Sequence, residues 1–194
     1  MINGFKYNME GQGQPFNGDT YLEKEFLRLK RDFKIKNVVE TGTYHGDSTA
    51  WFAANFLAVQ TIEFKMPQYL EAKKKLAALK NVSMVPGDSA RDLKTMIEGQ
   101  PNLLIFLDAH WYANPVIDEL KQIAACGLKP VIAIHDFKVP KKDFGFDSYN
   151  GQDYTFEWVE PHLKAIYGEF DYHYNTEATG AMRGCLFVYP KKSL

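Results

Sequence analysis

Side chains suited to acid–base, ligand-binding or metal chemistry follow the apolar runs of this sequence, at the point where each run ends. If these runs are parallel strands of one sheet, their carboxyl ends share an edge, and ligands bind in the crevice outside that edge. Helix capping could explain one such pair, but not the whole set. The pattern therefore predicts a single polar cleft. Its residues are Glu40, Glu63, Asp88 with Ser89, Asp108 with His110, and His135 with Asp136.

Residues 38–49 have the layout of a nucleotide-type pocket, in which a strand, a glycine turn and a helix start follow one another. Gly42 and Gly46 lack a Cβ, so they allow a tight turn and a close approach to a ligand. Their spacing is neither the G-x-G-x-x-G of dinucleotide enzymes nor that of a P-loop. Glu40 suits a cationic or hydroxyl-rich ligand better than a pyrophosphate. A tight turn that binds no ligand is the alternative.

Glu63 adds a second sign of a ribose-containing ligand. It lies 23 positions after Glu40, near the offset of about 20 residues at which an acidic side chain meets ribose hydroxyls in Rossmann-type sites. A carboxylate accepts hydrogen bonds from two hydroxyls and repels a 2′-phosphate. The alternative interpretation is a surface carboxylate at the end of its strand.

The elements that would position these residues follow from the spacing of apolar side chains. Strand-like runs alternate with helical patterns, which predicts an α/β fold with a mostly parallel sheet and helices on both faces. The last two strand-like runs leave no room for a crossover helix, so they predict an antiparallel hairpin at one edge of this seven-stranded sheet. The expected strands are 36–40, 59–64, 82–85, 103–107, 131–134, 170–174 and 185–189, and the expected helices are 20–32, 48–57, 67–79, 89–97, 115–126 and 154–167.

The remaining segments suggest how the chain is divided. Residues 1–18 contain several glycines and are expected to form a loop or flexible N-terminal arm, which the aromatics Phe5, Tyr7 and Phe16 could hold against the body of the protein. One domain over residues 19–194 is expected to follow. Residues 138–152 are expected to be a loop whose aromatic side chains, with the arm, are candidates for a substrate lid. Arg183 and Lys138 could bind an anionic substrate, although ordinary surface charge is the simpler interpretation.

Composition limits the classes of function. The net charge of −1 gives no general attraction to nucleic acid or anionic membrane, and no apolar run is long enough to span a bilayer. With only two cysteines and no signal-like N-terminus, a reducing, cytoplasmic location is expected. These features predict neither a nucleic-acid nor a membrane partner, and they leave the oligomeric state open.

Five segments of the chain, taken together and in order, resemble the motifs of a known family. The matching segments are residues 38–53, Glu63, residues 87–89, residues 106–111 and residues 134–136. Together they resemble the class I S-adenosylmethionine (SAM)-dependent methyltransferases, nearest to the small-molecule, catechol O-methyltransferase-like branch. The resemblance covers about residues 20–190 and implies a Rossmann-like fold that ends in an antiparallel strand pair.

The resemblance also implies a cofactor site. Glu63 would bind the ribose hydroxyls, Asp88 and Ser89 would lie beside the adenine, and Asp108 would face the sulfonium. Ser48 would fix the first turn of a helix, and the residues of the glycine turn would lie along the methionine part. The full implied set is Glu40, Gly42, Thr43, Tyr44, Gly46, Ser48, Glu63, Asp88, Ser89 and Asp108.

The catalytic end departs from the metal-dependent branch of that family. Asp108 and Asp136 could bind a hard cation such as Mg²⁺ through two oxygens, but Phe137 stands where that branch has Asn. Tyr112 stands where it has a catalytic lysine. A transition-metal-like site that includes a histidine is an alternative. The candidate catalytic residues are Asp108, His110, His135 and Asp136, with either histidine as the general base.

These observations predict a SAM-dependent methyltransferase that acts on a hydroxyl of a small molecule, with or without a divalent cation. A non-catalytic cofactor-binding or partner-binding protein of Rossmann-like fold is the alternative, because this fold also serves such roles. A nicotinamide-dependent oxidoreductase is disfavoured by the glycine spacing.

Overall fold

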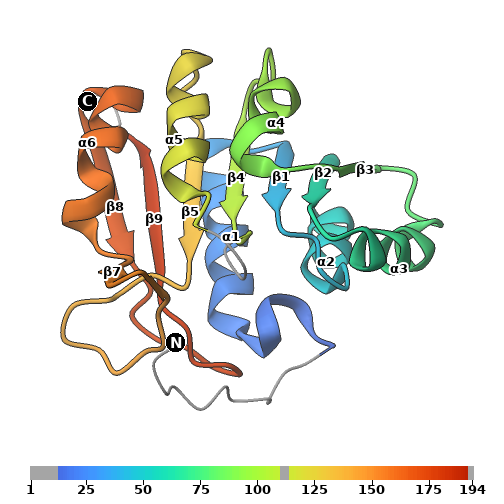
Figure 1. The fold of residues 1–194 in the computed structure, drawn as a ribbon, viewed down its shortest axis with the longest axis horizontal. Coiled ribbons are helices and arrows are strands. Elements are labelled where there is room, and N and C mark those ends of the chain that lie inside the picture. The colour runs from blue at the N-terminus through green and yellow to red at the C-terminus, as the bar shows by residue number, and fades with distance from the viewer. Residues whose placement is uncertain (1–12, 110–113, 192–194) are drawn as a thin grey trace.

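Helices and strands alternate along the chain much as the apolar spacing predicts. The computed structural model describes residues 13–109 and 114–191. The predicted bounds differ from the observed ones by small shifts at the ends of both helices and strands. The elements (Figure 1) are η1 (Pro15–Gly18), α1 (Thr20–Phe33), β1 (Asn37–Thr41), α2 (Asp47–Asn55), β2 (Ala58–Glu63), α3 (Met66–Leu76), β3 (Val82–Pro86), α4 (Ser89–Ile97), β4 (Leu103–Leu107), α5 (Val116–Ala125), β5 (Val131–His135), β6 (Ser148–Tyr149), β7 (Gln152–Asp153), α6 (Phe156–Tyr167), β8 (Phe170–Tyr174) and β9 (Cys185–Pro190).

Seven of the strands form one sheet in the order β3-β2-β1-β4-β5-β9-β8. Strands β1 to β5 pair in parallel, whereas β9 pairs antiparallel with both β5 and β8. The predicted mostly parallel sheet with a C-terminal antiparallel pair is therefore confirmed. The strand order reverses at β1, which lies between β2 and β4, and this switch point is where open parallel sheets bind ligands.

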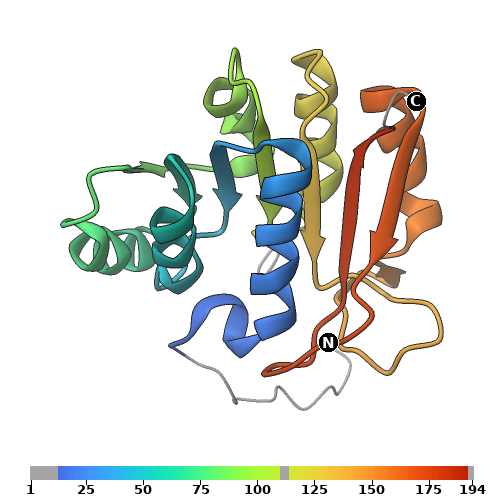
Figure 2. The same cartoon turned by 180° about the vertical axis from the view of Figure 1, so that it is seen from behind.

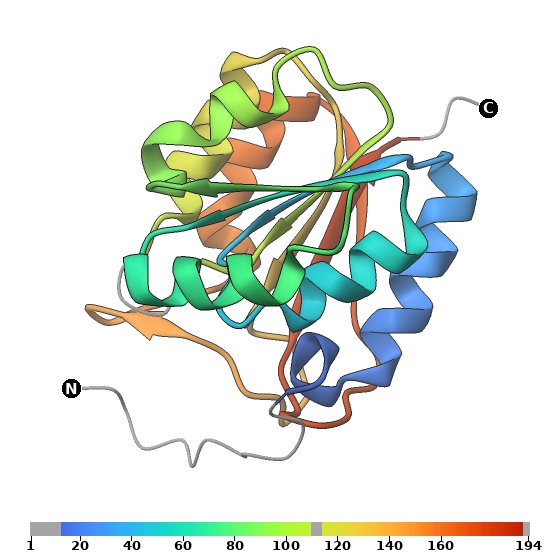
Figure 3. The ribbon, with the colours of Figure 1, turned by 90° about the vertical axis from the view of Figure 1, so that its right-hand side faces the viewer.

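Helices cover both faces of the sheet, as Figures 2 and 3 show. Helices α1, α2 and α3 lie on one face, and α4, α5 and α6 lie on the other. Successive strand residues point to opposite faces. Val38 accordingly packs with Phe26 and Phe52 in one core cluster, and Val39 with Leu93 and Leu120 in the other. Burial on both faces explains why the inner strands read as continuous apolar runs.

The end of the expected arm belongs to the body of the protein. Residues 1–18 were expected to be flexible, but Pro15–Gly18 form η1 and Phe16 is only 2% exposed. The Phe16 ring packs edge-on against Trp51, Phe52 and Phe106. Phe16 thus packs on the body of the protein, because burial of one large aromatic ring can fix a short turn despite the glycines around it.

The segment expected to be a plain loop, residues 138–152, contains a small hairpin. Strands β6 and β7 pair antiparallel as a second, two-stranded sheet. Gly145 bridges to Arg183 in the β8–β9 loop, with Gly145 N donating to the Met182 carbonyl and Gly184 N donating to the Gly145 carbonyl. Two loops far apart in sequence are thereby joined at the carboxyl edge of the sheet.

Two further features bear on the expected surroundings of the protein. Both cysteines, Cys126 and Cys185, are free thiols. Within residues 13–109 and 114–191, no helix has the length and apolar character required to cross a bilayer.

Candidate functional site

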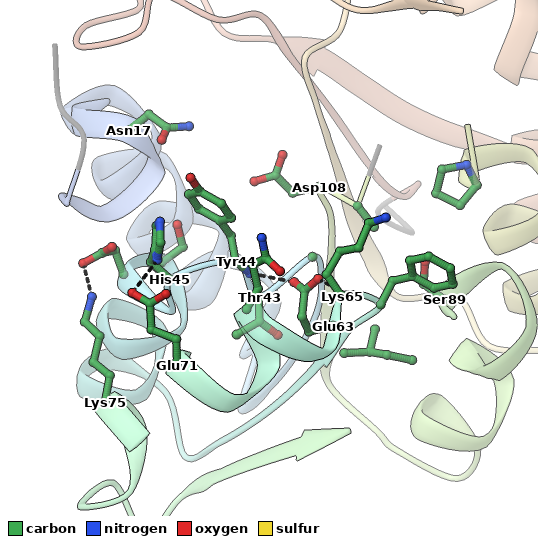
Figure 4. Close-up of a pocket in the computed structure, with 18 of the residues that line it drawn as sticks. Asn17, Thr43, Tyr44, His45, Glu63, Lys65, Glu71, Lys75, Ser89 and Asp108 are labelled. Carbon is green, nitrogen blue, oxygen red and sulfur yellow. Dashed lines mark hydrogen bonds and ion pairs between the residues drawn. The ribbon is translucent and has the colours of Figure 1, made fainter. Parts of the chain in front are cut away.

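A cavity of 810 Å³ opens at the carboxyl ends of β1 to β5 (Figure 4). This is the edge at which the sequence predicts a polar cleft, and the volume is in the usual range for small-molecule sites, roughly 300–1,000 Å³. The lining includes predicted site residues from all five strand ends: Gly42, Thr43, Tyr44, Ser48, Glu63, Asp88, Ser89, Asp108 and Asp136.

The glycine turn after β1 crosses directly over the end of β4. Gly42 has a φ of +83°, and a Cβ at this position would lie 2.5 Å from the backbone carbonyl oxygen of Asp108. Gly42 N also donates to the carbonyl of Ile62, at 2.9 Å. The turn therefore lies directly against the ends of β2 and β4, and position 42 has room only for glycine.

Glu63 is held in place by the turn that it faces. Tyr44 N donates to Glu63 Oε2 at 2.8 Å, and Lys65 N donates to Glu63 Oε1 at 2.8 Å. The side chain is mostly buried but lines the cavity (Figure 4). Each carboxylate oxygen can accept more than one hydrogen bond. Glu63 therefore has acceptor capacity left for hydroxyl groups of a ligand.

Glu40 lies beneath the turn and is not among the residues that line the cavity, although it was expected along the cofactor. It is 1% exposed, and it accepts hydrogen bonds from the hydroxyls of Thr49 and Thr61. Burial outweighs these hydrogen bonds and raises the pKa of Glu40 to about 8. Thr43 continues the network, since its hydroxyl lies 2.6 Å from that of Thr61. Glu40 therefore supports the turn from below.

Asp88 and Ser89 combine capping with a place in the cavity wall. Asp88 is the N-cap of α4, where its Oδ1 accepts from Ala90 N at 3.0 Å. Both residues line the cavity at the end of β3, next to Glu63. Gly46, by contrast, caps α2 and packs toward Leu76, so it shapes the turn without lining the cavity.

Asp108, His135 and Asp136 converge at the other end of the cavity. His135 Nδ1 lies 2.9 Å from Asp108 Oδ1 and 3.5 Å from Asp136 Oδ2. Burial alone would lower the pKa of His135, but the Asp136 and Asp108 carboxylates outweigh it and raise that pKa well above its usual value. Of these three residues, Asp108 and Asp136 line the cavity and His135 does not. His135 is 2% exposed and lies behind them.

Arg183 is not the surface charge that the simpler interpretation of the sequence predicted. It is mostly buried, and its guanidinium bridges two carboxylates: Nε donates to Asp136 Oδ1 and Nη2 donates to Asp147 Oδ1. Asp147 in turn accepts from the hydroxyl of Tyr149 at 3.3 Å. The β8–β9 loop thus fixes the carboxylate that ends β5. No local sequence signal links residues this far apart.

Two further outcomes concern cavity residues that were not predicted and a predicted residue that the structure does not describe. Gln14 and Asn17, from the segment around η1, line the cavity and were not predicted. Their glycine-rich surroundings gave no motif. His110, expected as a catalytic residue, lies outside the described residues, as does Tyr112.

Comparison with models of known protein families and with curated proteins finds no match. Solved structures of the same fold are found at low sequence identity. A Klebsiella pneumoniae protein provisionally assigned as an O-methyltransferase gives a TM-score of 0.62 at 19% identity, over 93% of this chain and 84% of its own. A SAM-dependent methyltransferase from Aquifex aeolicus gives 0.60 at 17% identity, over 95% and 98%.

The N-terminal domain of EvdMO1, solved in the presence of S-adenosylhomocysteine (SAH) and D-fucose, gives a TM-score of 0.61 at 13% identity, over 99% of this chain and 91% of that domain. This chain therefore has the Rossmann-like fold of the class I SAM-dependent methyltransferases.

Proposed function

We propose that this protein is a SAM-dependent methyltransferase that methylates a hydroxyl of a small molecule. One observation carries the proposal. The cavity at the strand switch point has the carboxylate of Glu63, oriented by two backbone N–H groups, at one end and the acidic pair Asp108 and Asp136 at the other. The fold shared with methyltransferases supports it.

The residues present fit the cofactor. Glu63 would accept the two ribose hydroxyls, because its oxygens are already oriented by the N–H groups of Tyr44 and Lys65. Ser89, at the start of α4, and Asp88 would border the adenine. Asp108 would lie nearest the sulfonium, where a carboxylate favours positive charge. The cavity volume accommodates both a cofactor of this size and a small acceptor.

The chain would contribute mainly by positioning and by charge. When bound, SAM supplies an electrophilic methyl group: the bond from sulfur to methyl breaks, the bond from oxygen to methyl forms, and the electron pair stays on sulfur. The Asp108 carboxylate would orient the acceptor hydroxyl and accept its proton. His135 would donate from Nδ1 to Asp108 and hold this carboxylate in place. Holding both reactants in register is worth several kcal/mol in such reactions.

A divalent cation is the second way to activate the hydroxyl. Asp108, His135 and Asp136 each offer a ligand atom, and these atoms lie within 4.8 Å of one another. Bound there, a cation would lower the pKa of the acceptor hydroxyl. Chelation separates the two versions of the proposal: with EDTA, methyl transfer persists if Asp108 accepts the proton unaided, and stops until Mg²⁺ or Mn²⁺ is restored if a cation is needed.

The proposal is tested first by calorimetric titration with SAH, for which we expect micromolar binding. Transfer of labelled methyl groups from SAM to a panel of hydroxylated small molecules tests the reaction. Asp108→Asn should reduce the transfer rate at least tenfold, because the acceptor loses its carboxylate partner. SAH binding without transfer to any acceptor would favour the non-catalytic, cofactor-binding alternative. No SAH binding at millimolar concentration would reject the proposal.

A further inference from the structure

The end of the cavity formed by β4 and β5 differs in chemistry from the end formed by β2 and β3. We call the first the acceptor end and define it by Asp108 and Asp136, together with Gln14 and Asn17 of the segment around η1, which the β8–β9 loop joins through Ala181 N and the Asn17 carbonyl. Glu63 and Asp88 lie on the opposite side of β1 in the sheet order. If Glu63 and Asp88 bind the cofactor, as proposed above, the acceptor end is left for the second substrate.

Asn17 is presented to this end by a rigid backbone turn. Its φ is +53°, a left-handed conformation that Asn adopts more readily than most residues. Its carbonyl accepts from Ala181 N at 3.1 Å, and the adjacent Phe16 N donates to Ser48 Oγ at 3.0 Å. A Cβ at Gly180 would lie 2.2 Å from the Asn17 carbonyl oxygen, so the β8–β9 loop packs closely on the turn.

The side chain of Asn17 is available to a ligand. It lines the cavity (Figure 4), and within residues 13–109 and 114–191 its carboxamide has no hydrogen-bond partner. A carboxamide both donates and accepts, which matches a hydroxyl group. Asp108 also lines this cavity, so a ligand there meets a carboxamide and a carboxylate, two groups that hydrogen-bond to hydroxyls.

The cations around the acceptor end are already engaged by the protein. Arg183 binds Asp136 and Asp147, Lys138 Nζ donates to Asp153 Oδ2 at 2.7 Å, and Lys142 Nζ donates to the Thr176 carbonyl at 2.8 Å. The two lysines among the described lining residues, Lys65 and Lys75, belong to the β2–α3 side.

His135 lies between Asp108 and Asp136, so it is engaged in the same way as Arg183. An anionic acceptor would therefore meet no uncommitted cation among the described lining residues of this end. Like charges at close range disfavour binding, and more strongly in a partly enclosed site than in water. A neutral acceptor avoids this cost and can still use the polar lining.

We infer that the acceptor is a neutral, polyhydroxylated small molecule of the sugar or polyol class, and that Asn17 determines this specificity by hydrogen bonding to a hydroxyl of the acceptor. The inference rests on the proposed methyltransferase function and adds the class of substrate to it. For protein that carries no divalent cation at Asp108 and Asp136, it excludes phosphorylated and other anionic acceptors, so the titrations are made with EDTA present.

The experiment compares matched neutral and anionic probes on SAH-saturated protein. Methyl hexopyranosides of several configurations are titrated by calorimetry beside the corresponding hexose 1-phosphates and catechol. We expect a neutral glycoside to bind at least tenfold more tightly than its phosphate and than catechol. Tighter binding of a phosphate or of catechol would overturn the inference, as would the failure of every glycoside on protein that binds SAH. Failure to bind SAH would instead reject the proposed function.

Variants of Asn17 test the role of this residue separately. Asn17→Gly keeps the left-handed turn and removes the carboxamide, so the glycoside should bind about tenfold more weakly, and KM for a methylated glycoside should rise more than kcat falls. Asn17→Lys adds a cation at the acceptor end and should raise the relative affinity for the 1-phosphate. SAH titration of each variant reports whether the cofactor end is intact. Unchanged glycoside affinity in Asn17→Gly, together with an unchanged preference of Asn17→Lys for the glycoside over the 1-phosphate, would rule out this role for Asn17.

Discussion

Glu63 Oε2 accepts the backbone N–H of Tyr44 at 2.8 Å, so the acidic residue that ends β2 is fastened to the glycine turn that follows β1. A second backbone group, Lys65 N, holds the other carboxylate oxygen. Two strand ends thereby set each other's geometry before any ligand arrives. Such preorganisation reduces the cost of binding, because the carboxylate does not have to be ordered by the ligand.

Glu63→Ala should weaken SAH binding by at least tenfold, since one charge-assisted pair of hydrogen bonds is worth about 1.5–3 kcal/mol. Calorimetric titration of SAH measures the change. Glu160→Gln is the control, because within residues 13–109 and 114–191 the Glu160 carboxylate pairs only with Lys164 of the same helix, α6, and does not line the cavity. Equal SAH affinity of the two variants would show that Glu63 does not hold the cofactor.

Gly42→Ala should both destabilise the protein and abolish SAH binding, because the new Cβ would lie 2.5 Å from the Asp108 carbonyl oxygen. Gly99→Ala is a matched control, since Gly99 also has a positive φ, +73°, but no atom lies within 4 Å of its Cβ position. Backbone strain alone costs about 1–2 kcal/mol. Urea unfolding should show a clearly larger loss for Gly42→Ala, and equal losses would argue against close packing of the turn.

The fold could be predicted from the sequence because the pattern that specifies each strand is local and recurs along the chain. Buried parallel strands leave continuous apolar runs such as Leu103–Leu107, and the side chain that follows each run can be named without knowing the sheet order. Glu63, Asp88, Asp108 and Asp136 were predicted in this way, and all four line one cavity.

The remaining features depend on contacts between distant segments. Phe16 enters the core although glycines surround it. Arg183 donates a hydrogen bond to Asp136, which lies 47 positions earlier in the chain, and this contact depends on the pairing of two loops. Whether Glu40 faces a ligand or the interior depends on the pleat of β1 and on Thr49 and Thr61, which no spacing rule includes. Propensity and periodicity describe one segment at a time and cannot supply such pairings.

Glu25 should make stability depend on pH in the acid range. Burial would raise the pKa of this α1 carboxyl, but hydrogen bonds from His173 and Arg28 outweigh it and lower the pKa to about 2. A pKa below the unfolded value of 4.5 stabilises the fold above pH 4.5, and this contribution disappears as the pH falls toward 2. Urea unfolding at pH 7 should show Glu25→Gln to be less stable by at most about 3 kcal/mol.

The difference in free energy of unfolding between wild type and Glu25→Gln should be smaller at pH 3 than at pH 7. At pH 3 the Glu25 carboxyl of the unfolded chain is largely protonated, so part of the stabilisation that its lowered pKa gives the folded protein is lost. An equal difference at pH 7 and pH 3 would mean that the variant loses packing, and that the ion pair with His173 contributes little.

Glu40 should have the opposite effect, and at higher pH. Its pKa of about 8 lies above the unfolded value of 4.5, so the folded protein keeps a proton that the unfolded chain releases. The contribution is full below pH 4.5, declines as the pH rises, and is lost above pH 8. Glu40→Gln keeps the shape and removes the titration. Between pH 5 and pH 8, wild type should therefore lose stability relative to Glu40→Gln, by at most about 4 kcal/mol. Parallel stability curves over this range would mean that Glu40 is ionised in the folded protein, and that Thr49 and Thr61 solvate its charge.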